Sequence, residues 1–165
     1  MNIRARRPDD DDAIDRLTRS AFAAGNRGHH GEAELVLRLR ADGDAAIELV
    51  ADMPGGLIGH VVLSPMRAPE HALGLGPISV HPDHWGQGIG AALMRAAIAA
   101  AEKRAAALIF LLGDPAFYGR FGFTAEAADA FRHDFPNPYF QALRLRPDAP
   151  VTGSAIYAAA FDGAD

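Results

Sequence analysis

The chain has 165 residues, of which 49% are hydrophobic and 22% charged, a composition typical of one globular domain. The absence of cysteine excludes disulfides, thiolate zinc sites and cysteine nucleophiles, and a formal charge of −5 argues against a basic nucleic-acid-binding surface. Because no apolar run could span a bilayer and no signal-peptide core is evident, we expect a single domain over residues 1–165, cytoplasmic and bound to neither membrane nor nucleic acid.

The first half of the chain is expected to alternate between strands and helices, as judged from the spacing of apolar residues and from turn residues. In chain order we expect a strand over 2–7, a helix carrying 14–22, a loop over 25–31, a helix over 32–40, and strands over 45–53, 57–63 and 72–80. The acidic run Asp9 to Asp12 suits the positive start of the first helix better than it suits a cation site. Gly76-Pro77 predicts a bulge or splaying of the last strand, because proline cannot donate to a sheet ladder.

The second half contains the most regular pattern. We expect a helix over 89–104, a strand over 107–112 that is covered on both faces, a short helix over 117–121, and then a loop and two further strands. A strand, a helix and a strand within about forty residues form a βαβ unit, whose strands are parallel. The fold class is therefore α/β, with N-terminal antiparallel strands and a parallel step in the middle.

Three glycines lie between the strand expected over 72–80 and the start of the helix expected over 89–104, in the stretch Gly86-Gln87-Gly88-Ile89-Gly90-Ala91. Each glycine costs about 1 kcal/mol against alanine inside a helix. Their advantage is access, since the free amides and the helix dipole favour a bound phosphate there. The stretch formally fits the dinucleotide fingerprint, but the first glycine does not follow directly on a first strand, and no acidic residue ends the next strand at the required spacing.

Two motifs carry a resemblance to a known family. The string from Val80 to Ala91, VHPDHWGQGIGA, resembles the acyl-CoA pyrophosphate loop of the GNAT N-acetyltransferase superfamily, with Trp85 where glutamine or arginine is usual. Downstream, the string from Gly113 to Phe123, GDPAFYGRFGF, resembles a narrower group of small bacterial predicted N-acetyltransferases. The similarity extends from about residue 3 to residue 161. It implies a GNAT fold, with a mixed, mostly antiparallel twisted sheet, a central parallel βαβ step and helices on both faces.

The resemblance also implies direct transfer of an acetyl group from the co-substrate acetyl-CoA to a primary amine, on a small molecule or a peptide. The expected cofactor-binding residues are Ile78, Ser79, Val80, Trp85, Gly86, Gln87, Gly88, Ile89, Gly90, Ala91 and Tyr118. In this scheme the loop amides hold the pyrophosphate and the strand edge at 78–80 pairs with the pantetheine arm. A backbone amide of the same strand would stabilise the oxyanion.

Tyr118 matches the position of a general acid that would protonate the departing CoA thiolate, with packing beside the cofactor as the alternative. The general base is open: Glu32 is the expected residue, and Glu34, His29, His30 and His133 are the other candidates. Glu32 and Glu34 lie two apart on a helix, so only one could reach the site. The alternative function is a non-catalytic acyl-CoA-binding module, and a homodimer is left open.

Other features are less specific. His81, Asp83 and His84 lack a further clustered ligand, so no metal is expected. Asp114 is expected to cap the following turn rather than to contact the cofactor. Arg120 would meet either the cofactor's phosphates or a surface acid, and the stretch 131–140 either walls the acceptor pocket or packs under a loop.

Overall fold

The computed structural model describes residues 1–25 and 31–163. Its elements follow in chain order: β1 (Asn2–Ala5), α1 (Asp11–Ala24), α2 (Glu32–Ala41), β2 (Ile47–Met53), β3 (Gly56–Pro65), β4 (Ala72–Val80), α3 (Ile89–Lys103), β5 (Leu108–Leu112), α4 (Pro115–Tyr118), α5 (Ala125–Asp129), β6 (Phe131–Arg132), β7 (Phe140–Arg144) and β8 (Gly153–Ser154). Among the described residues, no helix is both long and apolar enough to cross a membrane.

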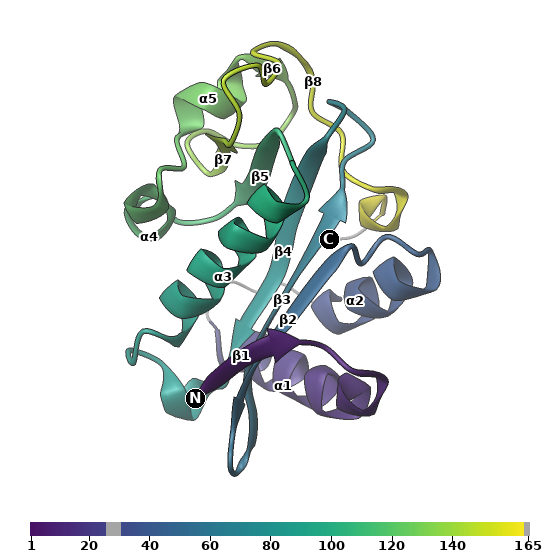
Figure 1. Ribbon diagram of the computed structural model, residues 1–165, viewed down its shortest axis with the longest axis vertical. Coiled ribbons are helices and arrows are strands. Elements are labelled where there is room, and N and C mark those ends of the chain that lie inside the picture. Colours follow the sequence, from purple (N-terminus) through teal and green to yellow (C-terminus); the bar gives the residue numbers. More distant parts are fainter. Residues whose placement is uncertain (26–30, 164–165) are drawn as a thin grey trace.

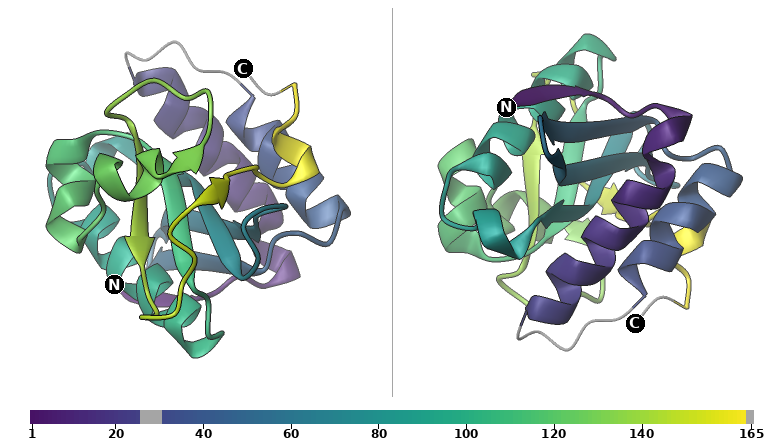
Figure 2. Two further views of the ribbon diagram at one scale, coloured as in Figure 1. Left: turned by 90° about the horizontal axis from the view of Figure 1, so that it is seen from above. Right: turned by 90° about the horizontal axis from the view of Figure 1, so that it is seen from below.

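A six-stranded sheet in the order β1-β2-β3-β4-β5-β7 forms the centre of the molecule. All neighbouring strands are antiparallel except β4 and β5, which the α3 crossover makes parallel. Helices α1 and α2 cover one face of the sheet and α3 covers the other (Figures 1 and 2). The expected mixed sheet with one parallel step and helices on both faces is confirmed.

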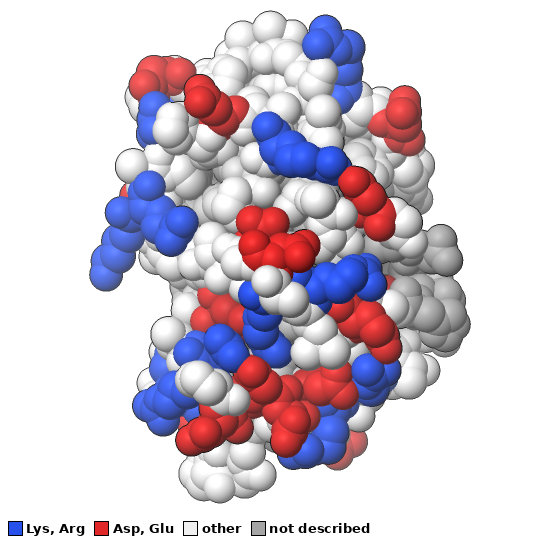
Figure 3. Space-filling view, turned by 90° about the vertical axis from the view of Figure 1, so that its right-hand side faces the viewer, with Lys and Arg blue, Asp and Glu red and all other residues white. Residues whose placement is uncertain are grey.

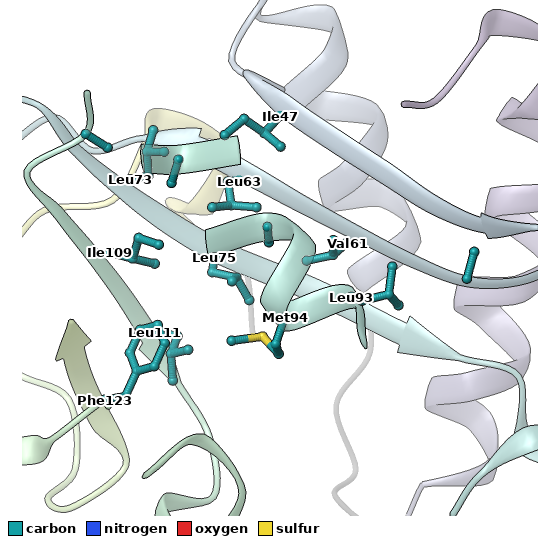
Figure 4. Close-up of a cluster of buried hydrophobic side chains, with 14 of the residues drawn as sticks. Ile47, Val61, Leu63, Leu73, Leu75, Leu93, Met94, Ile109, Leu111 and Phe123 are labelled. Carbon is teal, nitrogen blue, oxygen red and sulfur yellow. The ribbon is translucent and has the colours of Figure 1, made fainter. Parts of the chain in front are cut away.

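Helix α3, which connects the parallel strands β4 and β5, packs on the sheet over a hydrophobic core (Figure 4). Leu93, Met94 and Ala97 recur at helical spacing and are fully buried against β3, β4 and β5. On the opposite face, Leu39 of α2 is fully buried in a second cluster with strand residues of β2 and β3. Each such large side chain contributes about 1.5–3 kcal/mol on burial, so both faces fix the sheet firmly.

Strand β5 is buried on both faces, as the unbroken apolar run predicts. Ile109 and Leu111 belong to the cluster under α3, whereas Leu108 and Phe110 belong to a third cluster with α5, β6 and β7. Phe110 also stacks on Phe140 of β7, with ring centroids 5.4 Å apart. This arrangement holds the end of β5, which leads directly into the candidate site.

The tail after residue 123 differs from the expected loop and two strands. Residues 125–129 form helix α5, whose start is capped by Thr124, because its Oγ1 accepts a hydrogen bond from the Ala127 amide at 3.1 Å. Strand β7 forms, but the second expected strand shrinks to the two residues of β8, which pair in parallel with β6. After β8, Ile156 forms a single antiparallel bridge with Ala68, and residues Ala159–Phe161 form a short 3-10 helix.

The acidic run lies at the start of α1, as expected, but two of its carboxylates bind arginines in or just after β1. Asp10 accepts hydrogen bonds from both terminal nitrogens of Arg4 at 2.8 and 3.0 Å, and Asp11 binds Arg6 in the same two-pronged way. Asp10 makes no side-chain cap to α1 itself; it accepts from the Arg7 amide just before. Acidic and basic side chains accordingly intermingle on the face shown in Figure 3.

A buried polar network lies between α2 and the sheet. Glu48 Oε2 lies 2.7 Å from His60 Nε2 and 2.5 Å from Arg40 Nη2, and the side chains of Glu48 and His60 are 5% and 0% exposed. Burial by itself raises the pKa of the Glu48 carboxyl, but the hydrogen bonds and charges of His60 and Arg40 outweigh it and lower that pKa to about 2. Glu48 is therefore ionised at neutral pH, and His60 Nε2 donates to it.

Candidate active site

Strands β4 and β5 separate part-way along their length. They pair only from Ala72 to Gly74, opposite Leu108 to Phe110. Beyond this point Gly76 adopts a φ of 141°, Pro77 has no amide proton to donate, and the register between β3 and β4 shifts between Val61 and Leu63. The expected splaying at Gly76-Pro77 is confirmed, and it leaves the β5 side of residues 78–80 without a strand partner among the described residues.

A cavity of about 660 Å³, here called the cofactor cavity, opens at this separation. Ten of the eleven residues expected to bind the cofactor line it: Ile78, Ser79, Val80, Trp85, Gly86, Gly88, Ile89, Gly90, Ala91 and Tyr118. Gln87 does not line the cavity; its Oε1 lies 3.2 Å from His84 Nδ1 instead. The wall from α1, which includes Phe22, was not expected from the sequence.

The glycine-rich loop presents free backbone amides to this cavity. Gly86 and Gly88 have φ angles of 78° and 80°, a left-handed conformation that side chains other than glycine rarely adopt. Gly88 is the N-cap of α3, and the first hydrogen bond of the helix runs from the Ala92 amide to the Gly88 carbonyl. The amides of residues 89–91 therefore have no partner within the helix and remain available to an anion.

Trp85 has a side-chain contact that the sequence did not predict. Its indole Nε1 donates a 2.7 Å hydrogen bond to the carbonyl of Val80, the last residue of β4. The ring is 49% exposed and lines the cofactor cavity. Trp85 thus connects the glycine-rich loop to the strand edge, in a place where the family pattern has glutamine or arginine.

Arg120 lies at the cofactor cavity without an ion pair to any described residue. Its guanidinium lies 4.7 Å from the centroid of the Phe117 ring, which leaves its positive charge available to an anion. The alternative of a surface acid partner is therefore not found within the described residues. Asp114 caps α4, since its Oδ1 accepts from the Ala116 amide at 2.9 Å, as expected.

Tyr118 is positioned by the turn that ends β5. Asp114 and Pro115 start α4, and the Tyr118 amide donates to the Asp114 carbonyl at 3.0 Å. The ring packs edge-on against Phe117, with centroids 4.8 Å apart. Its edge lies so close to Gly113 that a Cβ built there would be 2.3 Å from Tyr118 Cε2. Glycine at 113 is therefore required by the location of the phenol.

A second cavity of about 750 Å³, here called the acceptor cavity, meets the first at Tyr118. Phe22, Ile78 and Tyr118 line both cavities. The other described walls of the acceptor cavity come from the start of α2, from Arg67, from residues 75–77 of β4, from Leu112, from residues 132–135 and from residues 154–157, 161 and 162. The stretch 131–140 thus contributes to a cavity wall, and also packs, through Phe131 and Phe140, into the core.

The structure separates the candidates for a general base. Glu32 lines the acceptor cavity and has no ion pair with a described residue, whereas Glu34 is exposed and paired with Arg19 at 2.9 Å. Both ring nitrogens of His133 are engaged: Nδ1 accepts from the Phe135 amide, and Nε2 lies 2.9 Å from Asp129 Oδ1. His133 therefore has no lone pair left for a substrate. His29 and His30 lie outside the described residues.

The histidines beside the glycine-rich loop have local roles. His81 Nδ1 accepts from the Asp83 amide at 3.1 Å, which fixes the turn that follows β4. Within residues 1–25 and 31–163, no group of three or more His, Asp or Glu side chains has the arrangement of a metal site.

Comparison with known proteins decides the family. A model of the acetyltransferase (GNAT) domain matches residues 44–125. The Escherichia coli protein named uncharacterized N-acetyltransferase YhbS is 36% identical over 165 residues, covering 95% of this chain and 96% of that protein. The chain belongs to the GNAT family of N-acetyltransferases. Acetyl-CoA is accordingly its co-substrate, and the resemblance seen in the sequence is confirmed.

Solved structures of GNAT proteins share the fold over nearly the whole chain. A Brucella melitensis GNAT acetyltransferase crystallised with acetyl-CoA is 38% identical, with a TM-score of 0.84 over 98% of this chain and 97% of that one. Escherichia coli YhbS crystallised with CoA is 34% identical, with a TM-score of 0.86 over 98% of this chain and 91% of that one. The GNAT fold predicted from the two motifs is therefore confirmed.

Proposed function

We propose that this enzyme transfers the acetyl group of acetyl-CoA directly to a primary amine at the junction of the two cavities. The observation that carries the proposal is that Phe22, Ile78 and Tyr118 line both the cofactor cavity and the acceptor cavity. Two substrates that enter from the two sides therefore meet beside a phenol. The crystallisation of the Brucella and Escherichia coli relatives with acetyl-CoA and CoA supports acetyl-CoA as the first of these substrates.

In this proposal the cofactor lies along three kinds of backbone and side-chain groups. The free amides of residues 89–91 bind the pyrophosphate, and Arg120 adds a positive charge at the same cavity. The edge of β4 at residues 78–80, which pairs with no described strand on its β5 side, takes the pantetheine arm as an added strand. Trp85 holds the loop to that edge through the Val80 carbonyl.

The chemical step follows from what lies at the junction. The neutral amine nitrogen attacks the thioester carbonyl, a C–N bond forms, and the C–S bond breaks as the tetrahedral oxyanion collapses. A backbone amide of residues 78–80 donates to the oxyanion, which is worth about 3–4 kcal/mol for one well-placed donor. Tyr118 gives its phenol proton to the CoA thiolate as it leaves, and the proton that the acylated nitrogen loses restores the phenol. No cysteine exists in the chain, so an acyl-cysteine intermediate is excluded.

The amine proton requires an acceptor, because an ordinary alkylamine is almost entirely protonated at neutral pH. We propose Glu32 for this role, either directly or through water. It is the candidate carboxylate that faces the acceptor cavity without a partner ion among the described residues. Its place in the first turn of α2 follows Gly31, whose φ of 97° turns the chain into the helix.

The test is Tyr118→Phe, which removes the proposed acid and keeps the ring that packs on Phe117. Acetyl-CoA should bind with an unchanged Kd, because the loop and the strand edge are untouched. We expect kcat to fall about 100-fold, the usual range for a lost general acid. Calorimetric titration with acetyl-CoA and a thiol-release assay over a library of amines measure the two quantities. Unchanged kcat with an unchanged pH profile would reduce Tyr118 to a packing residue.

A further inference from the structure

The walls of the acceptor cavity are largely apolar. Five described phenylalanines and tyrosines line it, and two of them, Tyr157 and Phe161, stack with centroids 4.7 Å apart. Leu112 and Ile156 also line it and are 44% and 43% exposed, although large aliphatic side chains are usually buried. Apolar surface exposed inside a concave site is the usual sign of an apolar ligand, since covering it releases water.

The charged side chains that line the acceptor cavity can balance one additional positive charge. Its carboxylates are Glu32, Asp134 and Asp162, and its guanidiniums are Arg67 and Arg132. Arg67 is already bound to Asp162 at 2.6 Å. Both ring nitrogens of His133 are already engaged, by the Phe135 amide and by Asp129. Among the described carboxylates and guanidiniums of this wall there is therefore an excess of one negative charge.

The remaining arginine is held by a neutral partner. Arg132 donates from Nε and Nη2 to the hydroxyl of Ser154, at 3.2 and 2.9 Å, so it bridges β6 and β8. Burial raises the pKa of the Tyr157 phenol, which keeps it neutral as well. A second ammonium group on the acceptor would need a second negative charge in the wall. Neither the Ser154 hydroxyl nor the Tyr157 phenol supplies one.

We propose that the natural acceptor is a monoamine on an aromatic or branched aliphatic body, such as an arylalkylamine, and not a polyamine or an aminoglycoside. This inference rests on the proposed amine acetylation and narrows its substrate class. The apolar body would lie against Leu112, Ile156 and the aromatic wall, while the single ammonium group balances the one excess carboxylate. A polyamine would bring several charges into a wall that offers one counter-charge, and would lose the hydration of the others.

The first experiment compares phenethylamine with spermidine as acceptors, with acetyl-CoA saturating and release of CoA thiol as the readout. We expect kcat/KM for phenethylamine to exceed that for spermidine at least tenfold, the factor that about 1.4 kcal/mol of differential binding gives. Equal or better use of spermidine would overturn the inference while leaving the proposed amine acetylation intact.

Two matched variants test whether the acceptor cavity makes this choice. Ile156→Ser removes an exposed aliphatic side chain from the cavity, and Val151→Ser removes another, 62% exposed, that lines neither cavity. For Ile156→Ser we expect the KM for phenethylamine to rise about tenfold, from the lost apolar contact, with the KM for acetyl-CoA unchanged. Val151→Ser should match the wild type in both. Equal effects of the two variants would contradict the assignment of the cavity.

A binding measurement separates the two proposals from each other. Phenethylamine is titrated by calorimetry into the protein saturated with free CoA, which cannot transfer an acetyl group. Binding that Ile156→Ser weakens and Val151→Ser does not, without any acetylation of phenethylamine or spermidine, would sink the catalytic proposal and keep the inferred ligand class. Acetylation of spermidine with no binding of phenethylamine would overturn the inferred ligand class and keep the catalytic proposal.

Discussion

Tyr118 owes its position to the missing side chain of Gly113. The phenol ring occupies the space where a Cβ at residue 113 would lie, 2.3 Å from Cε2 and 2.9 Å from Cδ2. The backbone at Gly113 is held on both sides, because its amide donates to the Tyr139 carbonyl at 2.9 Å and its carbonyl accepts from Gln141 Nε2 at 3.0 Å. Since neither this backbone nor β5 can easily move, the ring is the part that must give way.

We therefore predict that Gly113→Ala displaces Tyr118 and lowers kcat about 100-fold, the order of loss that a misplacement of about 1 Å can cause. The Kd for acetyl-CoA should change little, and the free energy of unfolding should fall by about 1–3 kcal/mol from overpacking. Thiol-release kinetics and urea unfolding measure these effects.

Gly119→Ala is the control for this prediction, since it lies in the same motif. Its φ is −57°, and a Cβ there would meet nothing within 4 Å, so alanine fits without strain. Its kcat should stay within twofold of the wild type. If Gly113→Ala is equally active, the phenol need not sit where the structure places it.

At this scale the sequence predicted which positions line the cofactor cavity better than it predicted their contacts. Nine loop and strand-edge positions line it, and they follow from the glycine spacing and from the family resemblance, both of which are carried by short local motifs. The engagement of both His133 nitrogens and the bond from Trp85 to Val80 depend on residues brought together by folding. Phe22 and Tyr157 could not be assigned to the site because their apolar spacing equally fits a core helix and a tail strand.

Among the elements, the loop that starts α3 makes a prediction of its own. In Gly88→Val, a β-branched residue must adopt a φ of 80°, which costs roughly 1–2 kcal/mol, and its side chain would stand among the amides proposed for the pyrophosphate. We expect the Kd for CoA to rise at least 100-fold. Trp85 is the single tryptophan of the chain and lines the same cavity, so its fluorescence reports the titration.

Gly43→Val separates strain from blockage in this experiment. Gly43 has a similar φ of 76° and open space around a built Cβ, but it lines neither the cofactor cavity nor the acceptor cavity. The variant should lose comparable stability in urea and bind CoA as the wild type does. A similar loss of CoA affinity in both variants would mean that strain alone, and not an anion site, explains Gly88.

The elements themselves were predictable wherever apolar periodicity is long. The strand over 72–80 forms with the expected bounds, and α3 ends one residue before the expected limit. Helix α5 was missed because it has only five residues, too few for a periodic signal, although Thr124 before an alanine-rich run was a usable cap signal. Strand β6 and its pairing with β8 were missed because the two short strands are distant in sequence, and their contacts, such as the burial of Phe131 in the core, form only on folding.

For the molecule as a whole, the network around Glu48 makes the free energy of unfolding depend on pH in the acid range. The pKa of Glu48 is about 2 in the folded protein and about 4.5 when unperturbed, so the folded state favours the ionised form. Its contribution is complete above pH 4.5 and is lost as the pH falls toward 2. A shift of this size is worth about 3 kcal/mol. Urea unfolding at pH 6, 4 and 3 should show a decline of about 2 kcal/mol from this group by pH 3, with the rest lost nearer pH 2.

Glu48→Gln tests the origin of the decline. The amide removes the nearer counter-charge of the buried Arg40 guanidinium and leaves it only Asp11, at 3.5 Å, so the free energy of unfolding should fall by about 3 kcal/mol at neutral pH. Between pH 4.5 and 3 the variant should lose less further stability than the wild type. Asp9→Asn, at an exposed residue without an ion pair to a described residue, should keep the wild-type pH dependence. Parallel curves for wild type and Glu48→Gln would assign the acid sensitivity elsewhere.

The three residue pairs that join β4 to β5 have a consequence for how the enzyme works over time. The chain closes its own sheet only as far as Gly74, and the proposed pantetheine arm would extend the ladder along residues 78–80. The cofactor would then supply one strand-like element of the sheet, which leaves with the CoA product at every turnover. The stability of the sheet would then depend on the concentration of acetyl-CoA, and the enzyme without cofactor would be less stable than the loaded enzyme.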